Sequence, residues 1–148
     1  MEPKLSRYLH EKGKKLGLPV SGTLELTPRC NFNCKMCYVH LTPEEQRQRG
    51  SERTLAQWLA LAQELREAGT VFLLLTGGEP FLRPDFPALY RALHRMGFVL
   101  SINTNGYLLR GTLRELLLEA PPARVNISLY GTDNETYQRF VALRPMTT

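Results

Sequence analysis

The sequence has no long hydrophobic run. Apolar stretches such as residues 71–75 are the length of a strand, whereas a membrane helix needs about 18 consecutive apolar residues. The first ten residues also lack the apolar core and the cleavage site of a secretory signal. With 43% hydrophobic and 22% charged residues in 148, the composition is typical of one soluble globular domain. We therefore expect a cytoplasmic protein with no membrane partner.

Positive charge is in modest excess and is not arranged for nucleic acid. The chain has 19 lysines and arginines against 14 acidic residues, a formal charge of +5. A nucleic-acid surface would need a longer basic stripe with interleaved aromatic residues. The group Lys12, Lys14 and Lys15 is typical of a solvated helix end, and we expect residues 1–22 to form a basic helical extension. Such a patch suits an acidic electron carrier, for example a ferredoxin or flavodoxin.

Cysteine is scarce, and its position is informative. The chain has only three cysteines, all in the run Cys30-Asn-Phe-Asn-Cys34-Lys-Met-Cys37. Reduced thiols clustered in this way argue against a disulfide framework. A cluster of four irons and four sulfurs takes four thiolates at its corners. Three thiolates leave one iron open, and an open position distinguishes a catalytic metal centre from a closed structural one.

Two simpler interpretations of the cysteines stay open. The three thiols and His40 have a spacing that suits tetrahedral zinc, although a zinc site would leave the Gly77–Pro80 segment unexplained. A ferredoxin-like electron carrier would need a fourth cysteine, which this sequence does not contain.

The rest of the chain alternates between predicted strands and predicted helices. Strands are expected at residues 23–28, 71–75, 98–102 and 125–129. Helical spacing of apolar residues falls between them, at 55–65 before Gly69, at 86–93 between Asp85 and Gly97, and at 113–117. Tyr137, Phe140 and Val141 suggest a further helix, capped by Thr132 or Asp133. This alternation predicts βαβ units and a parallel sheet, and the Val/Ile/Leu-rich strands suggest that both faces are covered.

Each predicted strand is followed by a polar or metal-binding segment. The cysteines follow the first strand, residues 76–80 the second and residues 103–106 the third, while the fourth carries Ser128 and runs into residues 130–131. The carboxyl ends of parallel strands share one edge of a sheet, which is where α/β folds place their sites. We expect these four segments to converge there.

Taken together, these motifs resemble the radical S-adenosylmethionine (radical SAM) enzymes. The resemblance runs from about residue 23 to residue 140. It is carried by the three cysteines, then by Gly77-Gly78-Glu79-Pro80, and then by the strand ends at 103–106 and 128–131. It implies an α/β fold with about four of the six βα units of the family's partial barrel, in an incomplete core domain at 23–148. The chain looks closest to the SPASM-type branch, which modifies peptides or proteins.

The resemblance also implies two cofactors and the residues that hold them. Cys30, Cys34 and Cys37 would bind a 4Fe–4S cluster whose fourth iron chelates the methionine part of S-adenosylmethionine. The cofactor contacts would come from Gly77, Gly78, Glu79, Pro80, Met36, Asn103, Asn105 and Ser128. Among them, Glu79 would accept a hydrogen bond from the amino group of the cofactor, and Met36 stands where the family usually has an aromatic residue near the adenine.

The implied activity is reductive cleavage of S-adenosylmethionine to a 5′-deoxyadenosyl radical, which abstracts hydrogen from a substrate. Two hypotheses follow. Either the chain is the cofactor-binding part of such an enzyme, or it is an inactive fragment that binds a cluster or zinc without turnover. Four βα units fill the sequence, so we expect a C-terminally truncated core whose last strand, 125–129, is an exposed apolar edge.

Overall fold

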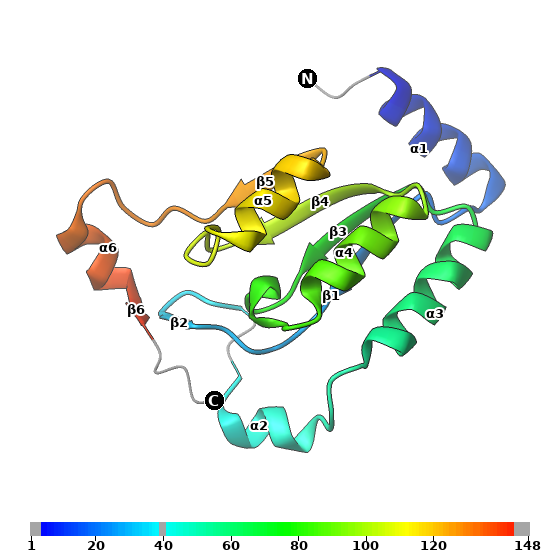
Figure 1. Ribbon diagram of the computed structural model, residues 1–148. Coiled ribbons are helices and arrows are strands. Elements are labelled where there is room, and N and C mark those ends of the chain that lie inside the picture. The colour runs from blue at the N-terminus through cyan, green and yellow to red at the C-terminus, as the bar shows by residue number, and fades with distance from the viewer. Residues whose placement is uncertain (1–3, 39–40, 144–148) are drawn as a thin grey trace.

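The computed structural model describes residues 4–38 and 41–143 (Figure 1). The elements, in chain order, are α1 (Lys4–Leu16), β1 (Ser21–Glu25), β2 (Phe32–Cys34), α2 (Pro43–Gln48), α3 (Leu55–Glu67), β3 (Phe72–Thr76), the 3-10 helix η1 (Pro80–Leu82), α4 (Phe86–Arg95), β4 (Val99–Thr104), α5 (Thr112–Glu119), β5 (Arg124–Ile127), α6 (Asn134–Phe140) and β6 (Val141–Leu143). None of these helices is long and apolar enough to cross a membrane.

The main sheet is parallel, and its strands follow their order in the chain. It runs β1-β3-β4-β5, with Leu24 beside Leu75 and Asn103 beside Asn126. This confirms the predicted α/β fold with four parallel strands of a partial barrel. Because all four strands point the same way, the segments after them leave the sheet at one edge. β5 lies at the side of the sheet, where Ile127 is 55% exposed and Leu129, just beyond it, is 72% exposed.

The core lies between the sheet and helices α3, α4 and α5, which cover one face (Figure 1). Alternate strand residues point into it, namely Leu73, Leu75, Leu100 and Ile102, all at most 2% exposed. The suggestion that both faces of the sheet are covered holds only in part among the described residues. Phe72 and Leu74 on the opposite face are only half-buried, and α1 reaches that face where His10 stacks on Phe72. In a (βα) barrel the helices form a ring outside the strands, so they cover only the outer face of the sheet.

Side-chain caps mark the starts of α2, α3 and α6. α3 begins with a capping box between Thr54 and Gln57, and α6 begins where the Asp133 carboxylate accepts a hydrogen bond from the Thr136 N–H at 2.7 Å. Asp85 stands at the start of α4 as predicted, but its carboxylate binds the guanidinium of Arg83 instead of capping the helix.

A second, two-stranded sheet joins the cysteine loop to the end of the described chain. β2 pairs antiparallel with β6, so that Phe32 faces Leu143 and Cys34 faces Val141. The Lys35 N–H also donates to the Phe140 carbonyl at 3.1 Å. Val141, which the sequence suggested as part of the last helix, is therefore the first residue of a strand. A three-residue strand is too short for a detectable period, and its partner lies more than a hundred residues away.

Candidate functional site

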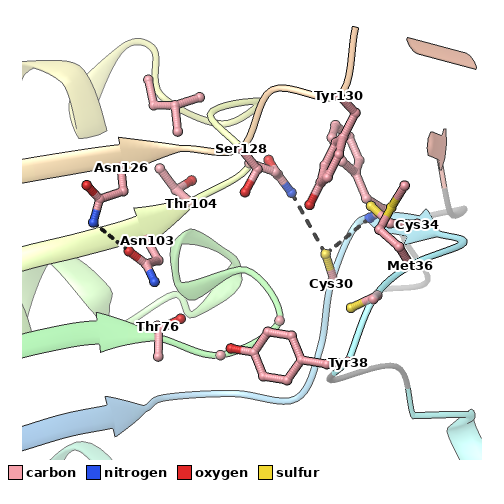
Figure 2. Close-up of a pocket in the computed structure, with 16 residues that line it drawn as sticks. Cys30, Cys34, Met36, Tyr38, Thr76, Asn103, Thr104, Asn126, Ser128 and Tyr130 are labelled. Carbon is pink, nitrogen blue, oxygen red and sulfur yellow. Dashed lines mark hydrogen bonds between the residues drawn. The ribbon is translucent and has the colours of Figure 1, made fainter. Parts of the chain in front are cut away.

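Three of the expected loops and the end of the fourth strand line one cavity of about 280 Å³ at the carboxyl edge of the sheet (Figure 2). All three cysteines line it. Of the expected cofactor contacts, the lining includes Met36, Gly77, Gly78, Asn103, Asn105 and Ser128. It does not include Glu79 or Pro80, which are both buried behind the cavity. The convergence expected at this edge is thus present in the tertiary structure.

The paired glycines bring two loops into contact. Gly78 N–H donates to the Thr27 carbonyl at 2.7 Å, and Glu79 N–H donates to the Arg29 carbonyl at 2.8 Å. A side-chain carbon on Gly77 would overlap the Thr27 carbonyl, and one on Gly78 would overlap the Arg29 carbonyl. Gly77 also has a φ of +135°, which favours glycine. The glycines therefore allow the turn after β3 to lie directly on the segment that leads into Cys30.

Glu79 lies behind the cavity as a buried brace, by which we mean a side chain that links two loops through hydrogen bonds. Its side chain is 0% exposed. It accepts hydrogen bonds from the Phe81 N–H at 3.1 Å, from the Asn105 N–H at 2.8 Å and from the Thr104 hydroxyl, which is 2.9 Å from both carboxylate oxygens. Burial raises the pKa of Glu79 above its ordinary value, although these donors oppose the shift. Glu79 thus ties η1 to the end of β4, and a contact of its side chain with the cofactor stays a prediction.

The ends of β4 and β5 present amides to the cavity. Asn103 and Asn126 are partners in the sheet, and the Asn126 side-chain amide donates to Asn103 Oδ1 at 2.8 Å. Ser128 follows β5, where its N–H donates to the Thr104 carbonyl at 3.0 Å. Its side chain is exposed on the cavity side, so it is not a core hydroxyl. These groups form a polar wall opposite the cysteine loop (Figure 2).

The Cys30 thiol is half-buried and lies next to two hydrogen-bond donors. Its Sγ accepts hydrogen bonds from the Phe32 N–H at 3.4 Å and from the Asn105 side-chain amide at 3.8 Å. Burial, together with the negative charge of Glu79, raises the pKa of the Cys30 thiol, while the Phe32 and Asn105 donors act against that rise. Asn31, next to it, is 3% exposed, and within the described residues its side-chain nitrogen has no hydrogen-bond partner.

An ion-pair network centred on the buried Arg83 supports the base of the cysteine loop. The Arg83 guanidinium is 5% exposed and donates to the Leu26 carbonyl, to Asp85 and to Glu52. Glu52 in turn accepts from the Thr27 hydroxyl at 2.6 Å and from Arg29 Nε at 2.7 Å. The network holds the end of β1 and the residues before Cys30 against the turn that leads into α4.

The donor set at the cavity fits an iron–sulfur cluster. Three half-buried thiols face a common space, two N–H groups point at one of them, and a buried amide beside it lacks an acceptor. In the part of the chain that the structure describes, no three His, Cys, Asp or Glu side chains are grouped as ligands of one metal ion. His40, the suggested fourth zinc ligand, lies outside the described residues.

Several cavity residues were not named as cofactor contacts from the sequence. Thr76 and Thr104 belong to the segments 76–80 and 103–106 that were expected at this edge. Asn126 lies near the carboxyl end of β5, so the rule that indicated Asn103 and Ser128 could also have found it. Tyr38, which is 84% exposed, also lines the cavity, as does Tyr130. No sequence pattern indicated a role for Asn31, because its relevance comes only from its position beside Cys30 and Asn105 in the folded chain.

The comparisons with known proteins agree with this geometry. The family model described as the radical SAM superfamily matches residues 24–148. The chain is 31% identical over 116 residues to a probable GTP 3′,8-cyclase of Pyrobaculum aerophilum, covering 78% of this chain and 36% of that protein. It is 32% identical over 132 residues to a PqqA peptide cyclase of Streptomyces rochei, covering 89% and 35%. The chain spans about a third of the length of these curated relatives.

Among solved structures, SuiB of Streptococcus suis bound to S-adenosylmethionine has a TM-score of 0.73 with 21% identity, covering 96% of this chain and 33% of that one. At that identity the likeness supports the fold. The chain therefore belongs to the radical SAM superfamily, as the sequence motifs indicated. Members of this family use a 4Fe–4S cluster and S-adenosylmethionine, the two cofactors expected from the sequence.

Proposed function

We propose that this chain binds a 4Fe–4S cluster through Cys30, Cys34 and Cys37, binds S-adenosylmethionine in the adjoining cavity, and acts in the radical-based modification of a peptide or protein. The observation that carries the proposal is the single cavity lined by all three thiols, by the paired glycines and by the ends of β4 and β5. A structural metal site would not need these strand-end amides.

When bound, the cluster supplies the electron that cleaves S-adenosylmethionine into methionine and a 5′-deoxyadenosyl radical, which removes hydrogen from a substrate. The protein residues bind and orient. Asn103 and Ser128 offer polar groups for the ribose and the methionine part of the cofactor. Gly77 and Gly78 leave their backbone accessible at the floor of the cavity. Met36, 49% exposed at the rim, supplies an apolar surface for the adenine.

The peptide substrate is supported by the relatives. The likeness to the PqqA peptide cyclase extends over 89% of this chain, and SuiB has a structure with its precursor peptide SuiA. Relatives of similar identity are named for nucleotide substrates, among them the GTP 3′,8-cyclase and a nucleotide dehydratase. A nucleotide is therefore the competing substrate class. For the electron, we propose an acidic donor such as a ferredoxin or flavodoxin, which the exposed Lys12, Lys14 and Lys15 of α1 would attract.

The test is 5′-deoxyadenosine formation by the chain, reconstituted anaerobically with iron and sulfide and supplied with dithionite and S-adenosylmethionine. We expect product above that of the Cys30→Ala variant, and more product when a mixed peptide library is added than when nucleoside triphosphates are added. Product equal to the Cys30→Ala level despite a fully assembled cluster would favour the alternative, a protein that binds the cluster without turnover. Stimulation by nucleotides alone would overturn the peptide assignment.

A further inference from the structure

Asn105, at the end of β4, has a side-chain orientation set by its neighbours. Its Oδ1 accepts the Tyr107 N–H at 2.9 Å, and its backbone N–H donates to Glu79 at 2.8 Å. With the oxygen occupied in this way, the amide nitrogen points to the other side. That nitrogen donates to Asn31 Oδ1 at 2.9 Å and lies 3.8 Å from Cys30 Sγ.

Asn31 provides a second amide, buried beside the contact between Asn105 and Cys30. Its oxygen accepts from Asn105, which leaves its nitrogen as a donor. The residue is 3% exposed, and among the described residues that nitrogen finds no acceptor. Buried donors in native proteins are nearly always paired, so an unpaired one next to a cysteine indicates an acceptor that is absent from the polypeptide. Thiolate or sulfide sulfur of a bound cluster has the required chemistry.

We propose that Asn105 is a positioning residue for Cys30, and that its amide, together with that of Asn31, donates hydrogen bonds to sulfur at this corner of the cluster and raises the reduction potential of the cluster. The inference rests on the proposed function. One-electron reduction adds negative charge to the cluster and its thiolates. Because an N–H donor stabilises the more negative state more strongly, each such bond makes the cluster easier to reduce.

The brace formed by Glu79 explains how Asn105 comes to this place. The Glu79 carboxylate holds both the Thr104 hydroxyl and the Asn105 N–H, so the end of β4 is fixed relative to the turn after β3. That turn lies directly on the segment leading into Cys30. The contact between Asn105 and Cys30 therefore joins two loops that the buried side chain of Glu79 keeps in register.

The experiment is a redox titration of the reconstituted chain, followed by electron paramagnetic resonance, with dithionite as the source of the electron and without S-adenosylmethionine. Iron per chain is measured in parallel. The test variant is Asn105→Ala, and the matched control is Asn103→Ala. The control removes an amide from the same strand and the same cavity, but its described partner is Asn126 and not a cysteine.

We expect Asn105→Ala to hold as much iron as the wild type and to have a more negative midpoint potential. An about tenfold lower ratio of reduced to oxidised cluster at a fixed potential corresponds to about 59 mV for one electron. Asn103→Ala removes a group proposed to bind S-adenosylmethionine, which is absent from this titration, and is expected to match the wild type in iron content and midpoint potential. A purely structural role of Asn105 would lower iron content without shifting the potential of the clusters that do form.

A second pair of variants covers the case in which Asn105→Ala does not fold. Asn105→Ser keeps a short side-chain oxygen that can accept the Tyr107 N–H, lacks the amide donor and adds no charge, and Asn103→Ser is its matched control. A more negative potential in Asn105→Ser than in Asn103→Ser supports the inference. Equal potentials in both pairs, with full iron loading, overturn it and leave the proposed function standing. Failure of the wild type itself to assemble a cluster overturns both.

Discussion

Replacing Glu79 with alanine tests the buried brace most directly. The carboxylate is fully buried and accepts hydrogen bonds from the Phe81 N–H, the Asn105 N–H and the Thr104 hydroxyl. In Glu79→Ala all three donors lose their acceptor. The turn after β3 then loses the side chain that links it to the end of β4.

The expected loss follows from the cost of unpaired buried donors, about 1–3 kcal/mol each. Three donors would cost about 3–9 kcal/mol if nothing moved. Part of this is returned, because burial raises the pKa of Glu79, which means that its ionised form is unfavourable in the folded protein. We expect a net decrease of about 3 kcal/mol in the free energy of unfolding, a large share of the 5–15 kcal/mol of an ordinary domain.

The assay is urea unfolding of the metal-free chain under reducing conditions, followed by far-ultraviolet circular dichroism. The matched control is Glu64→Ala on the exposed face of α3, for which we expect a change within about 0.5 kcal/mol. Glu79→Gln keeps one acceptor oxygen and should lie between the two. In the reconstituted protein, Glu79→Ala should retain the cluster and bind S-adenosylmethionine more weakly, because the end of β4 is no longer held.

Two results would contradict this reasoning. A decrease below about 1 kcal/mol in Glu79→Ala would mean that solvent or a rearranged loop satisfies the three donors, and that Glu79 is not a structural brace. Unchanged stability together with lost S-adenosylmethionine binding would instead favour the direct contact between the Glu79 carboxylate and the cofactor that the family resemblance implied.

Three further predictions concern the cysteine loop. Cys30→Ala should abolish cluster binding, measured as iron and sulfide per chain, and full iron loading in that variant would remove the site assignment. Gly78→Ala should cost about 1–3 kcal/mol in urea unfolding and lower iron loading, because its new side-chain carbon overlaps the Arg29 carbonyl; unchanged values would show that the loop can move aside. Burial opposes ionisation of Glu52, but the Arg29 and Thr27 hydrogen bonds outweigh it and hold the pKa of Glu52 below the ordinary 4.5. The stability from this group is therefore present above about pH 4.5 and lost as the pH falls through the folded-state pKa. Glu52→Gln should lack that acid-side loss when urea unfolding is compared across this range, and parallel curves for both proteins would contradict the assignment.

The strand and helix pattern was predictable because it depends on local periodicity. Leu73 and Leu75, and likewise Leu100 and Ile102, alternate into the core, and α3 begins at a capping box that the sequence contains. The parallel sheet followed from the alternation of these elements. The pairing of β2 with β6 was not predictable, because three residues carry no period and the partner strand is distant in sequence.

The sequence by itself determined the family, the three thiols and the edge of the sheet at which they gather, since these depend on residue identity, spacing and the common direction of parallel strands. Only the tertiary structure decided what the neighbouring side chains do. Glu79 was expected to contact the cofactor and lies buried between two loops, whereas Asn105 was expected only as a cofactor contact and also lies against Cys30. Such roles depend on which groups meet across 26 or 75 positions of sequence, and that is set by packing of the whole fold.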